Sequence, residues 1–184
     1  MKRRQFIRRT VLGFGGYLAV SAAACKPGKE PSRPAEPGGK SLNAGQLATL
    51  TAACERILPR DEDPGATDLG CAVYIDRMLA DADARALFGR ALIGGLAALD
   101  YQSHARYGKG FAAATPEEQD LLLASWQRSR QSGEKAFFEV LHSLTLEGAF
   151  GDPSYGGNLN GRGFALVGFT PPEPRPGHLM QLGY

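Results

Sequence analysis

The sequence predicts a mainly α-helical protein. We expect a bundle of four or five helices with a long ordered glycine-rich C-terminal segment, preceded by a signal peptide and a disordered linker. Apolar residues recur at helical spacing from Ser41 to Thr145. Seven glycines then lie between Gly148 and Gly168, and this spacing favours a shaped loop over a helix or strand.

The first 25 residues are typical of an export signal. Met1–Arg9 is basic, and Val11–Ala24 is an uncharged stretch of fourteen residues, shorter than the about 20 residues of a membrane-spanning helix. The paired Arg3 and Arg4, with Phe6 two positions on, resemble the twin-arginine export signature. We therefore expect a twin-arginine-type signal peptide; a general secretory signal with a fortuitous arginine pair is the alternative.

Two kinds of signal cleavage fit the sequence. Ala22–Cys25 resembles a lipoprotein box, in which Cys25 would be acylated and become the new N-terminus. Ordinary cleavage near Ala24 is the alternative. A lipid on Cys25 would tether the protein to the membrane, whereas ordinary cleavage would leave membrane association to a partner.

Residues 26–40 predict a disordered linker, because they hold four prolines, three glycines and no large apolar residue. Residues 41–184 are then one helical domain, within which residues 148–169 are the glycine-rich part. Residues 1–25 carry five of the 21 basic residues and no acid, which leaves 16 basic against 19 acidic residues in the remainder. A remainder with this balance is not expected to bind nucleic acid.

Start and stop signals divide the periodic stretch into five predicted helices. Asn43 with Gln46, and Thr115 with Glu118, form capping-box patterns at two of the starts. Asp83 is expected to cap a third start. The predicted helices span residues 43–58, 71–82, 83–107, 115–131 and 133–147.

Two features stand out inside these helices. Gly94 and Gly95 cost about 1 kcal/mol each against alanine, so we expect them to allow a close helix crossing. His142 lies near the inward face of the last helix, where a core histidine is a simpler interpretation than a metal ligand.

The glycine-rich segment, residues 148–169, contains turn sequences at residues 151–153 and 155–158. Ordering such a loop costs about 1–2 kcal/mol per residue, so either the body of the fold or a partner must hold it. Tyr155, Phe164 and Phe169 are candidates for insertion into a partner, because aromatic anchors dominate protein interfaces. Packing back onto the chain's own helices is the alternative.

Several short sequences around this segment also occur together in a known family. Thr145–Gly148, Phe150–Pro153, Tyr155–Asn158 and Gly168–Phe169 resemble the C-terminal signature of the gluconate 2-dehydrogenase subunit 3 family. The similarity extends more loosely back to about Leu42.

This resemblance implies a function. The chain would be a non-catalytic small subunit of a membrane-associated, flavin-dependent dehydrogenase of sugars or sugar acids. It would assist the folding, export and assembly of the large flavoprotein subunit. FAD would belong to that subunit and haem c to a cytochrome c subunit, with no cofactor bound by this chain. The protein would pass through the twin-arginine translocase and lie in the periplasm at the membrane.

Cys54 and Cys71 are seventeen positions apart on consecutive predicted helices, in a chain expected in an oxidising compartment. A disulfide between them would stabilise the fold by about 3 kcal/mol in the chain-entropy model. Two buried thiols, or a bond from one cysteine to another subunit, are the alternatives. The sequence contains no Cys-x-x-Cys-His motif for attaching haem c.

Glu147 and Asp152 are the acidic candidates. We expect each to anchor backbone amides in a partner-binding segment, because no second carboxylate or nucleophile stands beside either in the sequence. If one were instead a general acid–base, the chain would be a self-contained periplasmic enzyme. A third hypothesis is a lipid-anchored helical protein with an unrelated partner. We expect no catalytic, cofactor or metal residues, and the predicted partner-binding residues are Glu147, Asp152, Tyr155, Asn158, Phe164 and Phe169.

Overall fold

The computed structural model describes residues 39–171. These residues belong to two units, one ending at Gly163 and the other beginning at Phe164, and each is described by itself. The predicted signal peptide, with Arg3, Arg4, Phe6 and Cys25, lies outside the described residues, as does nearly all of the predicted linker.

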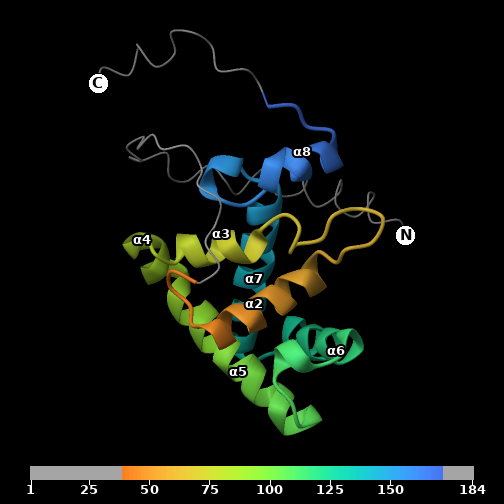
Figure 1. Ribbon diagram of the computed structural model, residues 1–184. Helices are drawn as coiled ribbons and strands as arrows, with labels where there is room; N and C mark the ends of the chain where they lie inside the picture. The colour runs from red at the N-terminus through yellow and green to blue at the C-terminus, as the bar shows by residue number, and fades with distance from the viewer. Residues whose placement is uncertain (1–38, 172–184) are drawn as a thin grey trace. The chain divides into compact units, whose positions relative to one another are not determined.

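Helices make up the body of the protein, defined here as residues 39–163 (Figure 1). The part of the chain that the structure describes contains no strand, so the mainly helical fold class is confirmed. The helices are α2 (Ala44–Ile57), α3 (Cys71–Met78), α4 (Ala82–Ala84), the π-helical turn η1 (Arg85–Gly89), α5 (Arg90–Tyr107), the 3-10 turn η2 (Phe111–Ala113), α6 (Pro116–Gln127) and α7 (Ser132–Phe150). After α7 come the short 3-10 turns η3 (Pro153–Tyr155) and η4 (Leu159–Gly161), and α8 (Arg162–Val167).

Both predicted capping boxes are confirmed. The Asn43 side chain accepts from the Gln46 N–H at 2.9 Å, and the Gln46 side chain accepts from the Asn43 N–H at 3.1 Å. Thr115 and Glu118 make the same reciprocal pair at the start of α6. Each box satisfies two helix-end N–H groups that have no partner within the helix.

The predicted cap of the third helix is wrong. Asp81, rather than Asp83, is the N-cap, and its carboxylate accepts from the N–H groups of Asp83 and Ala84 at 3.0 Å. An N-cap must precede the first helical residue and have an extended backbone, and Asp83 already lies inside α4. From α4 the chain continues through η1 into α5, so the predicted helix 83–107 is otherwise present.

Three helix ends also differ from the prediction. α3 ends at Met78 and α6 at Gln127, each about four residues early, and α7 does not stop before Gly148 but continues to Phe150. A glycine inside a helix costs about 1 kcal/mol against alanine. Here the contact of Gly148 with α3, described below, offsets that cost.

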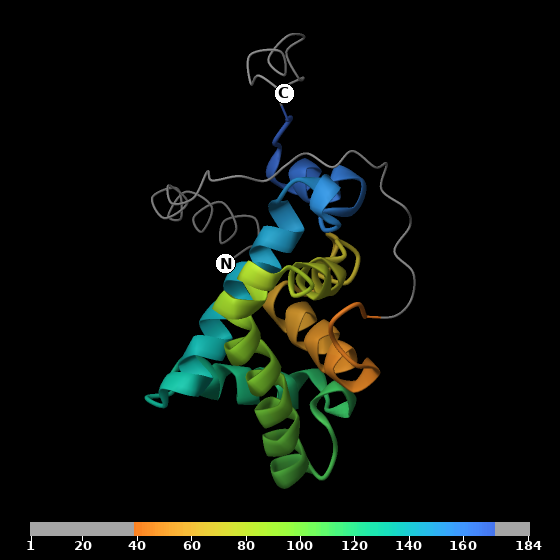
Figure 2. The same ribbon diagram turned by 90° about the vertical axis from the view of Figure 1, so that its left-hand side faces the viewer.

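α2, α3, α5 and α6 all pack against α7, and α2 also packs against α3, α5 and α6. In Figure 1, α2 and α3 cross α7, and Figure 2 shows α5 beside it, so the body is not a bundle of uniformly antiparallel helices. The rings of Trp126 and Phe137 meet edge-on, with centroids 5.2 Å apart, at the junction of α6 and α7. The largest fully buried side chains are Trp126, Phe111, Phe137, Leu50, Leu69, Ile75, Leu79, Leu92, Leu96, Leu99, Leu122 and Leu141.

Only one of the two adjacent glycines of α5 lies at a helix crossing. A Cβ on Gly95 would collide with the Phe137 ring and come within 2.8 Å of its Cβ, whereas a Cβ on Gly94 would meet nothing within 4 Å. The expected close crossing of α5 and α7 therefore depends on Gly95 alone.

A buried carboxylate holds the start of the body. The side chain of Asp76, on α3, accepts from three consecutive backbone N–H groups, those of Lys40, Ser41 and Leu42, at 2.5, 3.0 and 2.8 Å. Charge-assisted hydrogen bonds of this kind are stronger than neutral ones. Asp76 therefore fixes residues 40–42 at the start of the body.

His142 makes stability depend on pH. It is half-buried on α7, stacked on Phe138 with ring centroids 6.2 Å apart, and burial lowers its pKa. The unfolded chain therefore takes up a proton at higher pH than the folded chain, and stability falls as pH drops through the pKa of the unfolded chain. We expect the free energy of unfolding to fall between pH 7.5 and 5.5, and to fall less in His142→Gln.

Urea denaturation at several pH values measures this difference. Glu118 and Asp152 have lowered pKa values, through hydrogen bonding with Lys109 and the Ser154 N–H respectively. Their stabilisation is lost only below the usual carboxylate pKa of about 4, so it does not enter this pH window. Equal pH slopes for the two proteins would contradict the assignment to His142.

Candidate partner-binding site

The glycine-rich segment begins where α7 crosses α3. Gly148 lies on this face of α7: a Cβ there would be 2.9 Å from the Tyr74 ring and 3.2 Å from the Cys71 Cα. The helix ends two residues later, and the N–H of Gly151 donates to the Glu147 carbonyl oxygen at 2.7 Å. Gly148 therefore lets the end of α7 approach the start of α3 closely.

The chain then turns back over the end of α7. A Cβ on Gly157 would collide with the Gly148 carbonyl oxygen, and a Cβ on Gly163 would collide with that of Ala149. The N–H of Asn158 donates to the same Gly148 oxygen at 2.6 Å. At Gly157 and Gly163 the backbone of the segment comes so close to the backbone of α7 that only glycine fits.

Asn158 is the centre of this arrangement. It is fully buried and has a left-handed backbone with φ of 44°. Its side-chain NH₂ donates to the Gly151 carbonyl oxygen at 2.8 Å, and its side-chain oxygen accepts from the Gly163 N–H at 2.7 Å. Its side chain thus links Gly151 to Gly163 within the segment. Asn158 was predicted to bind a partner; in this structure it has no exposed surface, and its hydrogen bonds are made within the chain.

Asp152 stabilises the turn that follows α7. It is the N-cap of η3 and accepts from the Ser154 N–H at 2.8 Å, and this hydrogen bond lowers its pKa. The side chain is exposed. Through the hydrogen bond from the Ser154 N–H, Asp152 anchors a backbone amide, as expected from the sequence.

Polar and aromatic groups meet beside this turn. The pKa of the Tyr74 hydroxyl is raised, mainly by burial and then by hydrogen bonding with Glu147 and by the charge of Glu147. The nearby Tyr155 raises this pKa further. The Arg77 guanidinium lies so close to Gly156 that a Cβ there would collide with it. Tyr74 and Arg77 carry no sequence signal for this site, because only the packing of α3 against the segment brings Tyr74 to Glu147 and Arg77 to Gly156.

The segment presents apolar side chains to solvent. Tyr155 is 64% exposed, and Leu159, whose side chain also contacts Gly70, is 42% exposed. Leu159 was not among the predicted contact residues, since an isolated leucine between two asparagines carries no sequence signal. We define Glu147, Tyr155 and Leu159 as the exposed rim of the segment; the partly buried Arg77 lies next to it.

The unit that begins at Phe164 holds the other two predicted aromatic residues. Phe164 and Phe169 pack edge-on with ring centroids 4.9 Å apart, and the Phe169 N–H donates to the Phe164 carbonyl oxygen at 2.9 Å. Phe169 remains 50% exposed, while Phe164 is partly buried.

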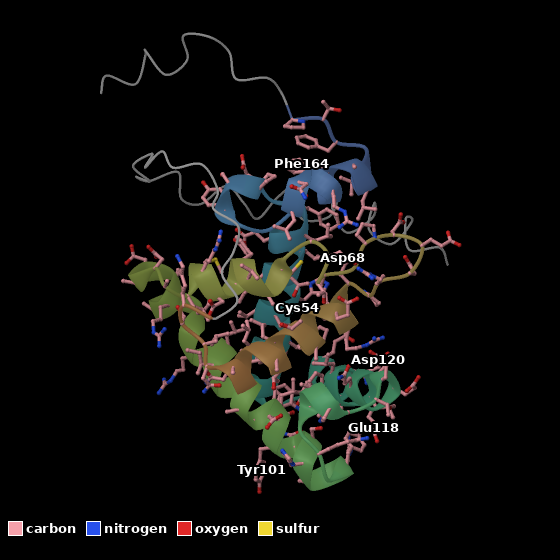
Figure 3. The ribbon with its side chains drawn as sticks, viewed as in Figure 1. Cys54, Asp68, Tyr101, Glu118, Asp120 and Phe164 are labelled. Carbon is pink, nitrogen blue, oxygen red and sulfur yellow. The ribbon has the colours of Figure 1, made fainter. Side chains whose placement is uncertain are left out.

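Cys54 and Cys71 are both buried free thiols in the structure (Figure 3 shows Cys54). The disulfide is therefore not formed here. Because neither side chain is exposed, the folded body offers neither cysteine to another subunit.

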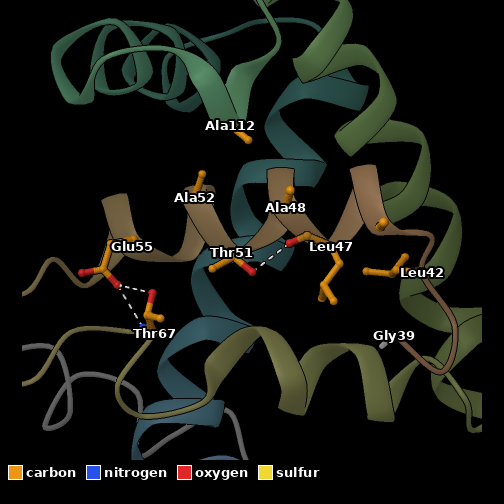
Figure 4. Close-up of a pocket in the computed structure, with 10 residues that line it drawn as sticks. Gly39, Leu42, Leu47, Ala48, Thr51, Ala52, Glu55, Thr67 and Ala112 are labelled. Atoms are coloured by element: carbon orange, nitrogen blue, oxygen red, sulfur yellow. Dashed lines mark hydrogen bonds between the residues drawn. The ribbon is translucent and has the colours of Figure 1, made fainter. Parts of the chain in front are cut away.

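A groove along α2 has a volume of about 890 Å³ (Figure 4). Small and apolar residues line it, including Leu42, Leu47 and Ala48. Its one carboxylate, Glu55, already accepts from the N–H and the hydroxyl of Thr67 at 2.9 and 2.7 Å. The polar groups of the groove are thus committed to the chain itself.

Two further observations concern residues 39–171 alone. No cluster of three or more His, Cys, Asp or Glu side chains there could hold a metal ion. None of the helices in this range is both long and apolar enough to cross a membrane.

The fold and the segment define a helical protein that carries an ordered glycine-rich surface element near its C-terminal end. Residues 44–171 match the family described as gluconate 2-dehydrogenase subunit 3, and the chain belongs to this family. No curated protein and no solved structure matches the chain. The matched range includes the whole glycine-rich segment, as the sequence resemblance implied.

Proposed function

We propose that this chain is the non-catalytic small subunit of a flavin-dependent dehydrogenase of the gluconate 2-dehydrogenase type. It would assist the folding, export and assembly of a flavoprotein subunit that oxidises a sugar or sugar acid. FAD would be held by that large subunit, and electrons would leave through a cytochrome c subunit. The complex would act at the periplasmic face of the membrane.

The observation that carries this proposal is the family match over residues 44–171. The geometry supports it, because backbone contacts within the body hold residues 148–163 of the segment and leave Tyr155 largely exposed. A rigid aromatic side chain beside charged groups is a common anchor in protein interfaces. A pre-ordered segment also loses little conformational entropy on binding.

Tyr155→Ala tests the contact. We expect the affinity for the flavoprotein subunit to fall at least about tenfold, because truncating a central aromatic anchor costs about 2 kcal/mol or more. Pull-down of the tagged chain from membranes, with flavin absorbance read in the eluate, measures the loss. Tyr101→Ala is the matched control, because Tyr101 is a 74% exposed tyrosine on α5, away from the segment.

Equal flavin recovery with Tyr155→Ala and Tyr101→Ala would contradict the assignment of the site. An isolated chain that oxidises a substrate without flavin would contradict the proposed function itself. It would favour the alternative of a self-contained enzyme using Glu147 or Asp152.

Export is tested at the paired arginines. In a chain with Arg3→Lys and Arg4→Lys we expect the protein and its flavoprotein partner to remain in the cytoplasm, because the translocase reads the arginine pair as an address. Fractionation followed by immunoblotting measures both subunits. Unchanged export of the variant would show that a general secretory signal is used.

A further inference from the structure

The two buried cysteines meet at one turn of α7. The Thr145 hydroxyl donates to the Cys54 sulfur at 3.3 Å, and a Cβ on Gly148, three residues later, would be 3.2 Å from the Cys71 Cα. Residues three apart on a helix are neighbours on one face. α2 and α3, which also pack on each other, therefore bring both cysteines to the same face of α7.

The folded body shields both thiols. Cys54 is 1% exposed and Cys71 is fully buried. Burial raises the pKa of Cys54 to about 12, and burial together with the nearby Cys54 raises the pKa of Cys71. Thiol–disulfide exchange needs an accessible thiolate, so neither group reacts until the body opens.

We propose that Cys54 and Cys71 are a latent disulfide site, which oxidises in the unfolded chain and is protected as a dithiol once the body has folded. In the oxidation the two thiols lose two protons and two electrons and form one S–S bond. A disulfide oxidant, such as oxidised glutathione or a protein disulfide, accepts the electrons and protons and becomes two thiols.

The redox state of Cys54 and Cys71 then depends on the compartment in which the body folded. A chain that folds in a reducing compartment and crosses the membrane folded keeps both thiols. A chain that crosses unfolded meets oxidant before the thiols are buried and acquires the disulfide. This consequence rests on the proposed export of the protein, whereas the latent site does not.

The test uses the full chain with Cys25→Ser, so that only the two cysteines of the site remain. Oxidised glutathione is added to the folded protein and, separately, to the protein unfolded in guanidinium chloride. We expect oxidation to be at least about a thousandfold slower in the folded protein, because reaction requires opening of the core. In the unfolded protein, peptide mapping should show the link between Cys54 and Cys71.

Refolding then tests the geometry. Because the structure brings both cysteines together, the oxidised chain should recover the native helical content on removal of denaturant. Cys54→Ser and Cys71→Ser chains, oxidised while unfolded, should carry only mixed disulfides with glutathione. Oxidation of the folded chain as fast as of the unfolded one, or an oxidised chain that cannot refold, would overturn the proposal.

Differential alkylation of the exported protein separates this proposal from the export route. Two free thiols agree with crossing in the folded state. A disulfide between Cys54 and Cys71, with the results on the purified chain as expected, would overturn export in the folded state and leave the latent site standing.

Discussion

Asn158→Ala is expected to open the glycine-rich segment and to destabilise it by about 3 kcal/mol or more. The change removes both side-chain hydrogen bonds, to Gly151 and from Gly163. Leaving a buried N–H or carbonyl without a partner costs about 1–3 kcal/mol each. Alanine must also adopt the left-handed backbone of this position, which costs about 1–2 kcal/mol. Binding of the flavoprotein subunit should weaken in parallel if the exposed rim is the contact.

Limited proteolysis with chymotrypsin measures the opening, since Tyr155 lies in the segment and is exposed. We expect Asn158→Ala to be cut after Tyr155 far faster than the wild type. Asn158→Asp, which keeps the oxygen that accepts from Gly163 but loses the donor to Gly151, should lie between them.

Asn160→Gly is the matched control for the segment. Asn160 also has a left-handed backbone, with φ of 59°, but its side chain is exposed. Glycine adopts this conformation without strain, so the variant should be as resistant as the wild type. An Asn158→Ala protein that resists cleavage equally well would contradict the role assigned to Asn158.

Gly95→Ala and Gly94→Ala should change stability in opposite directions. A methyl group at Gly95 meets the Phe137 ring, which cannot move freely because it packs against Trp126. Overpacking of this kind costs about 1–3 kcal/mol, more than the about 1 kcal/mol gained in helix propensity. We therefore expect Gly95→Ala to lower the free energy of unfolding by up to about 2 kcal/mol.

The methyl group of Gly94→Ala faces solvent and meets no atom within 4 Å. Here only helix propensity acts, and we expect a gain of up to about 1 kcal/mol. Urea denaturation of both variants measures the two effects. Equal effects of the two substitutions would show that α5 and α7 do not cross at Gly95 as the structure has them.

Local signals predicted the helices well. The capping boxes at Asn43 and Thr115 depend on residues three apart, so the chain near each start already contains both partners of the bonds. The cap at Asp81 was missed because aspartates at two nearby positions are equally good caps. The extension of α7 through Gly148 was missed because it depends on the contact of Gly148 with α3. The residues of α3 that make this contact are far away in the sequence.

The candidate site could likewise be predicted only in part from local sequence. Glycine, aspartate and proline spacing predicted a shaped segment, and Asp152 caps a turn in it as local chemistry requires. Asn158 was expected to face a partner, but its hydrogen bonds reach residues that only folding brings to it. Arg77 and Tyr74 could not be assigned to the site, because α3 and the segment are more than 60 residues apart along the chain.

The sequence by itself determined the helical class, the two capping boxes at Asn43 and Thr115 and the family to which the chain belongs. These depend on short-range periodicity and on motifs that the printed residues already contain. Only the tertiary structure decided which glycine permits a helix crossing, which side chains of the segment are exposed and how the two cysteines are buried. The physical reason is that each of these is set by close contacts between helices distant in the chain, and no local pattern specifies them.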